Sequence, residues 1–315
     1  MTVYLEFEKP IAALEARILE LQETADEGAI NVDAETAKLR VKADRQLQDT
    51  YAKLTAWQKT QVARHPERPH FKHFVATALD DFVPLAGDRA FGDDQAIMGG
   101  LARIGDVRFV LIGHEKGDDT ESRLKHNFGM GKPEGYRKAI RLMTLAEQFR
   151  LPVVALVDTS GAFPGIQAEE RGQAEAIARS TARCLSLTVP MISCIVGEGG
   201  SGGAVAFAAA DRILMFEHAV YAVISPEGCA SILWRTNEKA ADAAQAMKMT
   251  ADDLKKLGVI DRIVPEPMGG AHRDHALAIA TLAKAILAEI AALKTLKPEQ
   301  IKQNRRDKFL KMGLL

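Results

Sequence analysis

The chain has few cysteines, few aromatic residues and almost no net charge. It holds three cysteines among 315 residues, aromatic residues make up 6% of it, and its formal net charge is −1. A balance so close to neutral gives no general electrostatic reason to expect nucleic acid or a membrane surface as a partner. The low aromatic content also argues against a platform on which nucleobases would stack.

The cysteines, Cys184, Cys194 and Cys229, lie far apart and form no CxxC pair. We expect buried thiols rather than a metal site, and a reducing compartment, the cytoplasm. No basic N-terminal segment precedes an apolar run, and no stretch approaches the ~18 uninterrupted apolar residues of a membrane span. The sequence therefore predicts neither a secretory signal nor a transmembrane helix.

Two amphipathic helices are predicted before about residue 66. The first carries one apolar stripe, formed by Ile11, Leu14, Ile18 and Leu21. Asp33 can cap the second, whose apolar face holds Leu39, Ala43, Leu47, Tyr51 and Leu54. The segment "RHPERP" (64–69) ends it. These residues could not fill a core of their own, so we expect a helical arm that packs on the main domain or on a partner.

Beyond about residue 105, short apolar runs alternate with helical patterns. The runs predict strands buried on both faces, over 107–113, 152–158, 190–196 and 221–225. Helices are predicted over roughly 135–149, 168–185 and 203–210, and a long amphipathic helix carries the stripe from Ile279 to Leu293. This alternation is typical of an α/β fold with parallel strands.

A glycine-rich loop follows a strand and opens a helix twice, in "VVALVDTSGAFPG" (153–165) and "ISCIVGEGGSGGAV" (192–205). Free backbone N–H groups and the positive end of the helix dipole collect at such a place and favour a negative group. Glycine allows a ligand to approach the backbone closely. The pair of loops predicts a site for an anion.

Four interpretations of the second loop can be compared. It is a poor phosphate loop, because Ala204 and Val205 stand where Lys and Ser/Thr are required. "GEGGSG" (197–202) fits a dinucleotide fingerprint, but only Glu217 loosely supplies the acid that should follow. "GGSGG" (199–203) fits the nucleophile-elbow pattern of a serine hydrolase, with histidines further along the chain. The fourth interpretation is an oxyanion hole of backbone amides, with Ser201 as a small bystander.

Six segments carry a family resemblance: 128–143, 158–165, 168–179, 197–204, 223–234 and 259–273. Together the chain resembles the alpha subunits of the acetyl-coenzyme A carboxylase carboxyltransferase of bacteria and plastids, almost from end to end. The family usually has Pro at the position of Ser160 and often Tyr at that of Phe163. Since Pro fixes φ, its absence would soften that loop.

The resemblance implies a crotonase-type α/β fold, a superhelix of ββα units with an N-terminal helical arm. It implies a heterotetramer of two alpha and two beta subunits, acting with the biotin carboxyl carrier protein and, in the larger complex, with biotin carboxylase. The reaction would move the carboxyl group of carboxybiotin to acetyl-CoA and give malonyl-CoA. In the family the amides of Gly202 and Gly203 would stabilise the ureido oxygen. The zinc ribbon belongs to the beta subunit, so no metal is expected here.

We divide the chain into an N-terminal helical segment (1–31), a carboxyltransferase domain that begins with the helical arm (32–295) and a C-terminal helical tail (296–315). Further candidates for substrate contact or loop shape are Gly161, Ala162, Gly165, Gly199, Gly200, Ser201, Ala204, Arg171 and Arg137. The basic segment 123–141 is either a site for CoA phosphates or the acidic carrier, or a solvated helix face. Glu169 and Glu170 are expected to cap a helix, and 304–311 to form an exposed helical tail.

Other functions remain open from the residues alone. A stand-alone crotonase-type hydratase or decarboxylase would need a catalytic acid over the thioester. A serine hydrolase would use Ser201 as its nucleophile. A non-catalytic scaffold would explain the helical arm but would leave the paired glycine loops without a purpose.

Overall fold

The computed structural model describes residues 3–27 and 32–313. In this part of the chain eight strands form one sheet, in the order β1-β2-β3-β4-β5-β6-β8, with β7 beside β5. The strands are β1 (Asp81–Pro84), β2 (Ile97–Ile104), β3 (Val107–His114), β4 (Val153–Thr159), β5 (Met191–Gly200), β6 (Arg212–Phe216), β7 (Val220–Ala222) and β8 (Arg262–Val264).

The helices follow the chain between and around these strands. They are α1 (Lys9–Glu27), α2 (Asp33–Tyr51), α3 (Ala56–Ala63), α4 (Phe71–Ala78), α5 (Thr120–Lys125), α6 (Pro133–Gln148), α7 (Ile166–Glu170), α8 (Gln173–Ser186), α9 (Ser201–Ala208), α10 (Pro226–Trp234), α11 (Ala240–Ala246), α12 (Ala251–Lys256), α13 (His275–Leu293) and α14 (Pro298–Lys311). Short 3₁₀ turns cover Glu6–Glu8 and Asn127–Gly129.

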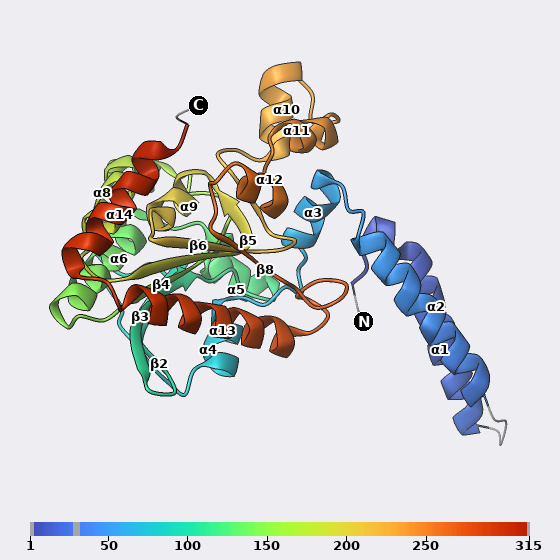
Figure 1. The fold of residues 1–315 in the computed structure, drawn as a ribbon. Coiled ribbons are helices and arrows are strands. Elements are labelled where there is room, and N and C mark those ends of the chain that lie inside the picture. The colour runs from blue at the N-terminus through green and yellow to red at the C-terminus, as the bar shows by residue number, and fades with distance from the viewer. Residues whose placement is uncertain (1–2, 28–31, 314–315) are drawn as a thin grey trace.

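The predicted parallel pairing holds from β3 onward, where β3, β4, β5, β6 and β8 run in one direction. Helices α4 and α13 cover one face of the sheet, and α6, α8 and α9 cover the other (Figure 1). Because both faces are covered, every residue of β4 and β5 is buried, which explains their continuous apolar runs. The edge formed by β1, β2 and β3 is antiparallel and was not predicted.

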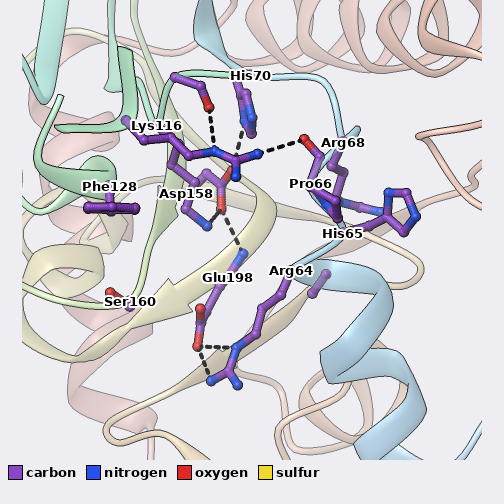
Figure 2. A pocket seen from close by; sticks show the side chains of 13 residues that line it. Arg64, His65, Pro66, Arg68, His70, Lys116, Phe128, Asp158, Ser160 and Glu198 are labelled. Atoms are coloured by element: carbon purple, nitrogen blue, oxygen red, sulfur yellow. Dashed lines mark hydrogen bonds and ion pairs between the residues drawn. The ribbon is translucent and has the colours of Figure 1, made fainter. Parts of the chain in front are cut away.

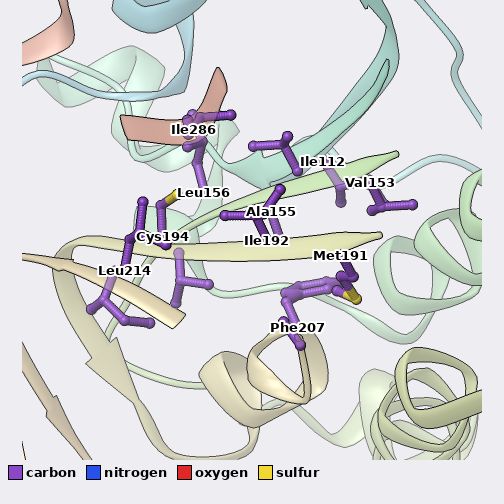
Figure 3. Packing of buried hydrophobic residues seen from close by; sticks show 14 of the residues in the cluster. Ile112, Val153, Ala155, Leu156, Met191, Ile192, Cys194, Phe207, Leu214 and Ile286 are labelled. Atoms are coloured by element: carbon purple, nitrogen blue, oxygen red, sulfur yellow. The ribbon is translucent and has the colours of Figure 1, made fainter. Parts of the chain in front are cut away.

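One large apolar cluster fills the space between the sheet and its helices. Figure 3 shows part of it, with Leu156 of β4 and Cys194 of β5 close to Ile286 of α13. On the opposite face of the sheet, Phe207 of α9 packs toward Met191. The predicted strands 107–113, 152–158 and 190–196 are thereby confirmed as the central part of the sheet.

Three predicted elements are wrong in their extent. The segment 221–225 is a strand only as far as Ala222 and is half-buried there, and Ser225 instead caps α10 through the amide of Gly228. The predicted helix 168–185 is split into α7 and α8 at Gly172, whose φ of 81° is left-handed. The predicted helix 203–210 begins earlier, at Ser201.

The two N-terminal helices form an antiparallel hairpin that projects from the body (Figure 1). Their predicted stripes face each other, and Ile11, Leu47 and Tyr51 pack with Val62 of α3 in a separate apolar cluster. The base of the hairpin is therefore joined to the body through α3. The proposed domain boundary after residue 31 lies outside the described residues, and the division into domains stays a prediction.

Near the C-terminus, the predicted long amphipathic helix is confirmed as α13, whereas the expectation for the tail needs correction. Helix α13 is long and apolar enough to cross a bilayer by length and composition alone. It packs against the sheet, however, and Ile279, Leu282 and Ile286 are buried. The tail is helical as predicted, but it is exposed only in part. Arg305 is 1% exposed and donates to the Asp211 carboxylate, so it anchors the helix to the body.

Candidate active site

The two glycine-rich loops lie side by side because β4 and β5 are parallel neighbours. Their pairing shifts by two residues, since Val157 faces Ile195 while Thr159 faces Gly199. The carboxylate of Asp158 fills the space created by this bulge and accepts the amide of Glu198 at 3.0 Å. A Cβ at Gly197 would lie 2.4 Å from that carboxylate, so glycine is required there. One buried acid thus holds both loops together.

The second loop ends in residues 199–203, which we call the glycine turn. The turn leads directly into α9, so Gly202 and Gly203 occupy the second and third positions of that helix. Amides of a first helical turn have no acceptor within the helix, and they lie at the positive end of its dipole. The predicted pair of glycines therefore stands where backbone donors can meet a negative oxygen.

The glycine turn is pressed against the first loop. A Cβ at Gly200 would lie 2.2 Å from the carbonyl oxygen of Ser160, and a Cβ at Gly203 would lie 2.8 Å from the carbonyl carbon of Gly161. At Gly202 the nearest atoms would belong to Ile177, at 3.5 Å, which is an ordinary contact. Gly200 and Gly203 are thus needed for the close approach of the loops, and Gly202 is not.

Two amides of the first loop are already hydrogen-bonded within the protein. The N–H of Gly161 donates to the hydroxyl of Thr159 at 3.1 Å, and that of Phe163 donates to the carbonyl of Gly131 at 3.0 Å. Gly165 precedes α7, and its carbonyl accepts the amide of Ala168. The first loop leads into α7, which has five residues, whereas the glycine turn leads into α9, which has eight. The two loops are therefore not equivalent as sites for an anion, although the sequence predicted a pair of similar loops.

Ser201 has an unusual backbone. Its φ is 49°, a left-handed value that is uncommon for a residue with a side chain, and the residue is exposed. Among the described residues no histidine is hydrogen-bonded to it. His272 stacks on His65 at 3.9 Å between ring centroids, and His275 bonds the carbonyl of Glu67. Neither of the two histidines that the nucleophile-elbow interpretation offered is therefore placed as a base for Ser201.

A cavity of about 260 Å³ opens beside the glycine turn, and Ser160 and Glu198 line it (Figure 2). On its wall Lys116 donates to Asp158 at 2.7 Å, and His70 lies 3.5 Å from the other carboxylate oxygen. Burial would raise the pKa of Asp158, but Lys116 and His70 hold it well below its usual range. Asp158 is thus a fixed anion beneath the loops rather than a proton donor.

The glycine turn is also tied to the N-terminal helices. Arg64, the residue after α3, donates from Nη2 to Glu198 at 2.6 Å and from Nη1 to Glu227 at 2.6 Å. Burial opposes the charge of Arg64, but hydrogen bonds to these two carboxylates raise the pKa of its guanidinium above the ordinary value. In the sequence, Arg64 is recognisable only as part of a segment that ends a helix, and no spacing indicates its partners.

Some cations of the basic segment 123–141 are paired within the chain, whereas Lys125 is exposed and Arg123 lines the cavity described above, so the role of the segment stays a prediction. Arg137 donates to Asp88 at 2.7 Å, and Lys138, which is 3% exposed, donates to Asp93 at 2.5 Å. Arg171 is paired with Glu134. These cations hold the loop before β2 and the start of α8 in place, and contact of Arg137 or Arg171 with a substrate stays a prediction.

The remaining candidates have structural surroundings. Gly199 and Ala204 are buried, and a Cβ at Gly199 would lie 3.0 Å from the ring of Tyr221. Ala162 is half-buried and packs against the main cluster. Within the described residues, Glu8, His65 and His272 bring three possible metal-ligand atoms within 4.8 Å of one another. His65 uses both ring nitrogens, on the carbonyl of Val3 and the amide of Glu67, and so offers no free ligand atom.

Known proteins match this chain over nearly its whole length. A family model described as acetyl co-enzyme A carboxylase carboxyltransferase-like matches residues 4–313. The acetyl-coenzyme A carboxylase carboxyl transferase subunit alpha of Rhizorhabdus wittichii is 70% identical over 313 residues, which cover 99% of this chain and 100% of that protein. The subunit of the same name from Zymomonas mobilis is 65% identical over 314 residues, covering 99% and 100%.

Solved structures share the fold at low sequence identity. A transcarboxylase 12S matches with a TM-score of 0.60 and 19% identity over 73% of this chain, and the match spans only 42% of that chain. A Pseudomonas malonate decarboxylase heterotetramer matches with a TM-score of 0.59 and 16% identity, over 74% of this chain and 90% of the other. The predicted crotonase-type fold is confirmed. The chain belongs to the family of acetyl-coenzyme A carboxylase carboxyltransferase alpha subunits.

Proposed function

We propose that the chain is the alpha subunit of a biotin-dependent carboxyltransferase, which with a beta subunit forms malonyl-CoA from acetyl-CoA. The carboxyl group would arrive as carboxybiotin on the biotin carboxyl carrier protein. The assembly would be a heterotetramer of two alpha and two beta subunits, working in the cytoplasm beside biotin carboxylase. The family membership of the whole chain supports the reaction class.

The observation that carries the assignment of the site is the position of Gly202 and Gly203. Their amides open α9, and Gly203 is held against Gly161 so closely that no side chain fits. Such fixed donors stabilise a developing negative oxygen without having to reorganise during the reaction. The ureido oxygen of biotin gains negative charge when the carboxyl group leaves, so a pair of amides fits this group.

The part of this chain in the reaction is therefore electrostatic. Gly202 and Gly203 would orient the ureido oxygen, and the glycine turn would hold its shape because Asp158 and the first loop fix it from behind. No titratable side chain is required to donate or remove a proton in this scheme. Biotin supplies the carboxyl carrier chemistry, and the acyl-CoA side of the site would be completed by the beta subunit.

The test is reconstitution with a beta subunit of the same family. Decarboxylation of malonyl-CoA would be measured with and without a soluble biotin analogue, for each subunit alone and for the mixture. We expect turnover only in the mixture and only with the analogue. Turnover of malonyl-CoA or an enoyl-CoA by this chain alone would contradict the proposal and favour a stand-alone hydratase or decarboxylase.

A further inference from the structure

The segment between α3 and α4 grips β5 immediately before the glycine turn. Arg64 donates from Nε (3.1 Å) and Nη2 (2.6 Å) to one oxygen of Glu198, the residue that precedes Gly199. Arg68 donates from Nε to the carbonyl of Val196 at 2.9 Å. Two arginines from one short linker therefore hold the last residues of the strand, and Figure 2 shows Arg64 and Glu198 together at the cavity.

The two arginines differ in their surroundings. Arg68 is 1% exposed and forms a bidentate salt bridge with Glu266, so replacement of Arg68 would disturb the core. Arg64 is part-buried, lines the cavity and reaches Glu227 as well as Glu198. Because Glu227 lies in the first turn of α10, one guanidinium joins α3, the end of β5 and α10.

The charge of Glu198 makes this contact important for an anion site. The residue is 7% exposed, and a buried carboxylate without a partner is strongly unfavourable. An uncompensated negative charge next to the glycine turn would also repel the negative oxygen that the amides are meant to stabilise. Arg64 supplies a compensating charge and a fixed geometry at the same time, and Glu227, which shares the guanidinium, is more exposed and needs less compensation.

We propose that Arg64 is a positioning residue for carboxyl transfer, which acts through Glu198 to hold the glycine turn in place and to cancel the carboxylate charge beside it. The inference rests on the proposed function of the turn. It extends that function by making the junction between the N-terminal helices and the body part of the active site. Neither Arg64 nor Glu198 needs to touch the substrate.

The assembled enzyme tests this with four variants: Arg64→Gln, Arg64→Lys, Glu198→Gln combined with Arg64→Gln, and the control Arg212→Gln. Arg212 also pairs with a glutamate, Glu289, but it starts β6 at the opposite end of the sheet. We expect Arg64→Gln to lower kcat of biotin-dependent malonyl-CoA decarboxylation by about 10- to 100-fold, with KM for malonyl-CoA within about twofold.

The other variants separate charge from geometry. The kcat of the double variant should be about tenfold higher than that of Arg64→Gln, because the double variant lacks the unpaired buried carboxylate. Arg64→Lys should also recover part of the loss, and the control should match the parent enzyme. A double variant as slow as Arg64→Gln would overturn the charge-cancelling role. Equal kcat for Arg64→Gln and the parent would overturn the inference altogether.

Amide hydrogen exchange gives a readout that does not depend on the reaction. Peptides covering 196–207 should exchange several-fold faster in Arg64→Gln, while peptides from β3 should not change. Faster exchange throughout the chain would mean general destabilisation and would refute a positioning role.

If Gly203→Ala leaves transfer intact, the proposed function fails. If Gly203→Ala stops transfer while Arg64→Gln changes neither kcat nor exchange, only the present inference fails.

Discussion

A methyl group added at Gly203 should stop carboxyl transfer, whereas the same group at Gly202 should be tolerated. At Gly203 the new Cβ would lie 2.8 Å from the carbonyl carbon of Gly161, 3.0 Å from its oxygen and 3.1 Å from Cγ2 of Thr159. Two of these atoms are backbone, so the loop or the turn has to move. At Gly202 the nearest atoms would be two side-chain carbons of Ile177 at 3.5 Å.

The magnitudes follow from the role of the amides. Loss of one oxyanion donor costs about 10²–10³ in rate, and a shift of about 1 Å in a catalytic group costs up to about 10². We therefore expect Gly203→Ala to lower kcat about 100-fold and Gly202→Ala to keep it within about threefold. Gly202→Ala should also stabilise the chain by up to ~1 kcal/mol, because alanine favours the helix over glycine.

The assay is biotin-dependent decarboxylation of malonyl-CoA by the assembled enzyme, with the melting temperature of each variant measured alongside. Both variants should assemble with the beta subunit, so that a change in kcat reports on the site. If Gly203→Ala were as active as Gly202→Ala, the close approach of the two loops would not matter for catalysis. The account of the glycine turn would then be refuted.

Three further predictions concern stability and reactivity. Arg305→Met should destabilise the chain by about 3–5 kcal/mol in urea unfolding, because it leaves the buried carboxylate of Asp211 without its partner, while Arg306→Met on the exposed side should change little. Burial and the charge of neighbouring groups lower the pKa of His272 to about 3. Below pH ~6.5 the unfolded chain therefore binds up to one proton more than the folded chain. The free energy of unfolding falls as the pH drops from 6.5 toward 3, by up to ~2 kcal/mol at pH 5. In His272→Phe this loss should shrink, and an unchanged dependence of the urea midpoint on pH would contradict the assignment. A thiol reagent should modify Cys229 in the folded chain and all three cysteines in denaturant, because burial raises the pKa of the other two thiols, and rapid labelling of all three without denaturant would show that the core is open.

Much of the central fold could be predicted because buried parallel strands have a simple sequence signature. The runs that became β3, β4 and β5 are mostly apolar, and glycines mark the loop after β4 and the end of β5. The antiparallel edge was missed because β1 and β2 are partly exposed and β2 contains two glycines. The left-handed Gly172 gave no periodic signal, so one long helix was predicted where two occur.

The site was predictable only in its backbone part. Glycines at the start of a helix after a strand indicate an anion site from spacing alone, and this located Gly202 and Gly203. Arg64 and Glu198 are 134 residues apart, and only the folded chain brings them together. The partial burial of the tail was missed for a similar reason. Arg305 lies in a strongly polar segment, and its burial is explained by the carboxylate of Asp211 and by the backbone carbonyls of Cys184, Leu187 and Val189, which only the folded chain brings to it.

In the proposed mechanism, backbone amides and no nucleophilic side chain carry out the work of this subunit. The measurement that tests it most directly is kcat of the assembled enzyme with Ser201→Ala, at saturating malonyl-CoA and biotin analogue. Ser201 lies in the middle of the glycine turn and has the left-handed backbone that a nucleophile elbow would also show. We expect a change of no more than about threefold, because only a hydroxyl is removed. A loss of about 10⁴ or more, as expected for a missing nucleophile, would contradict it.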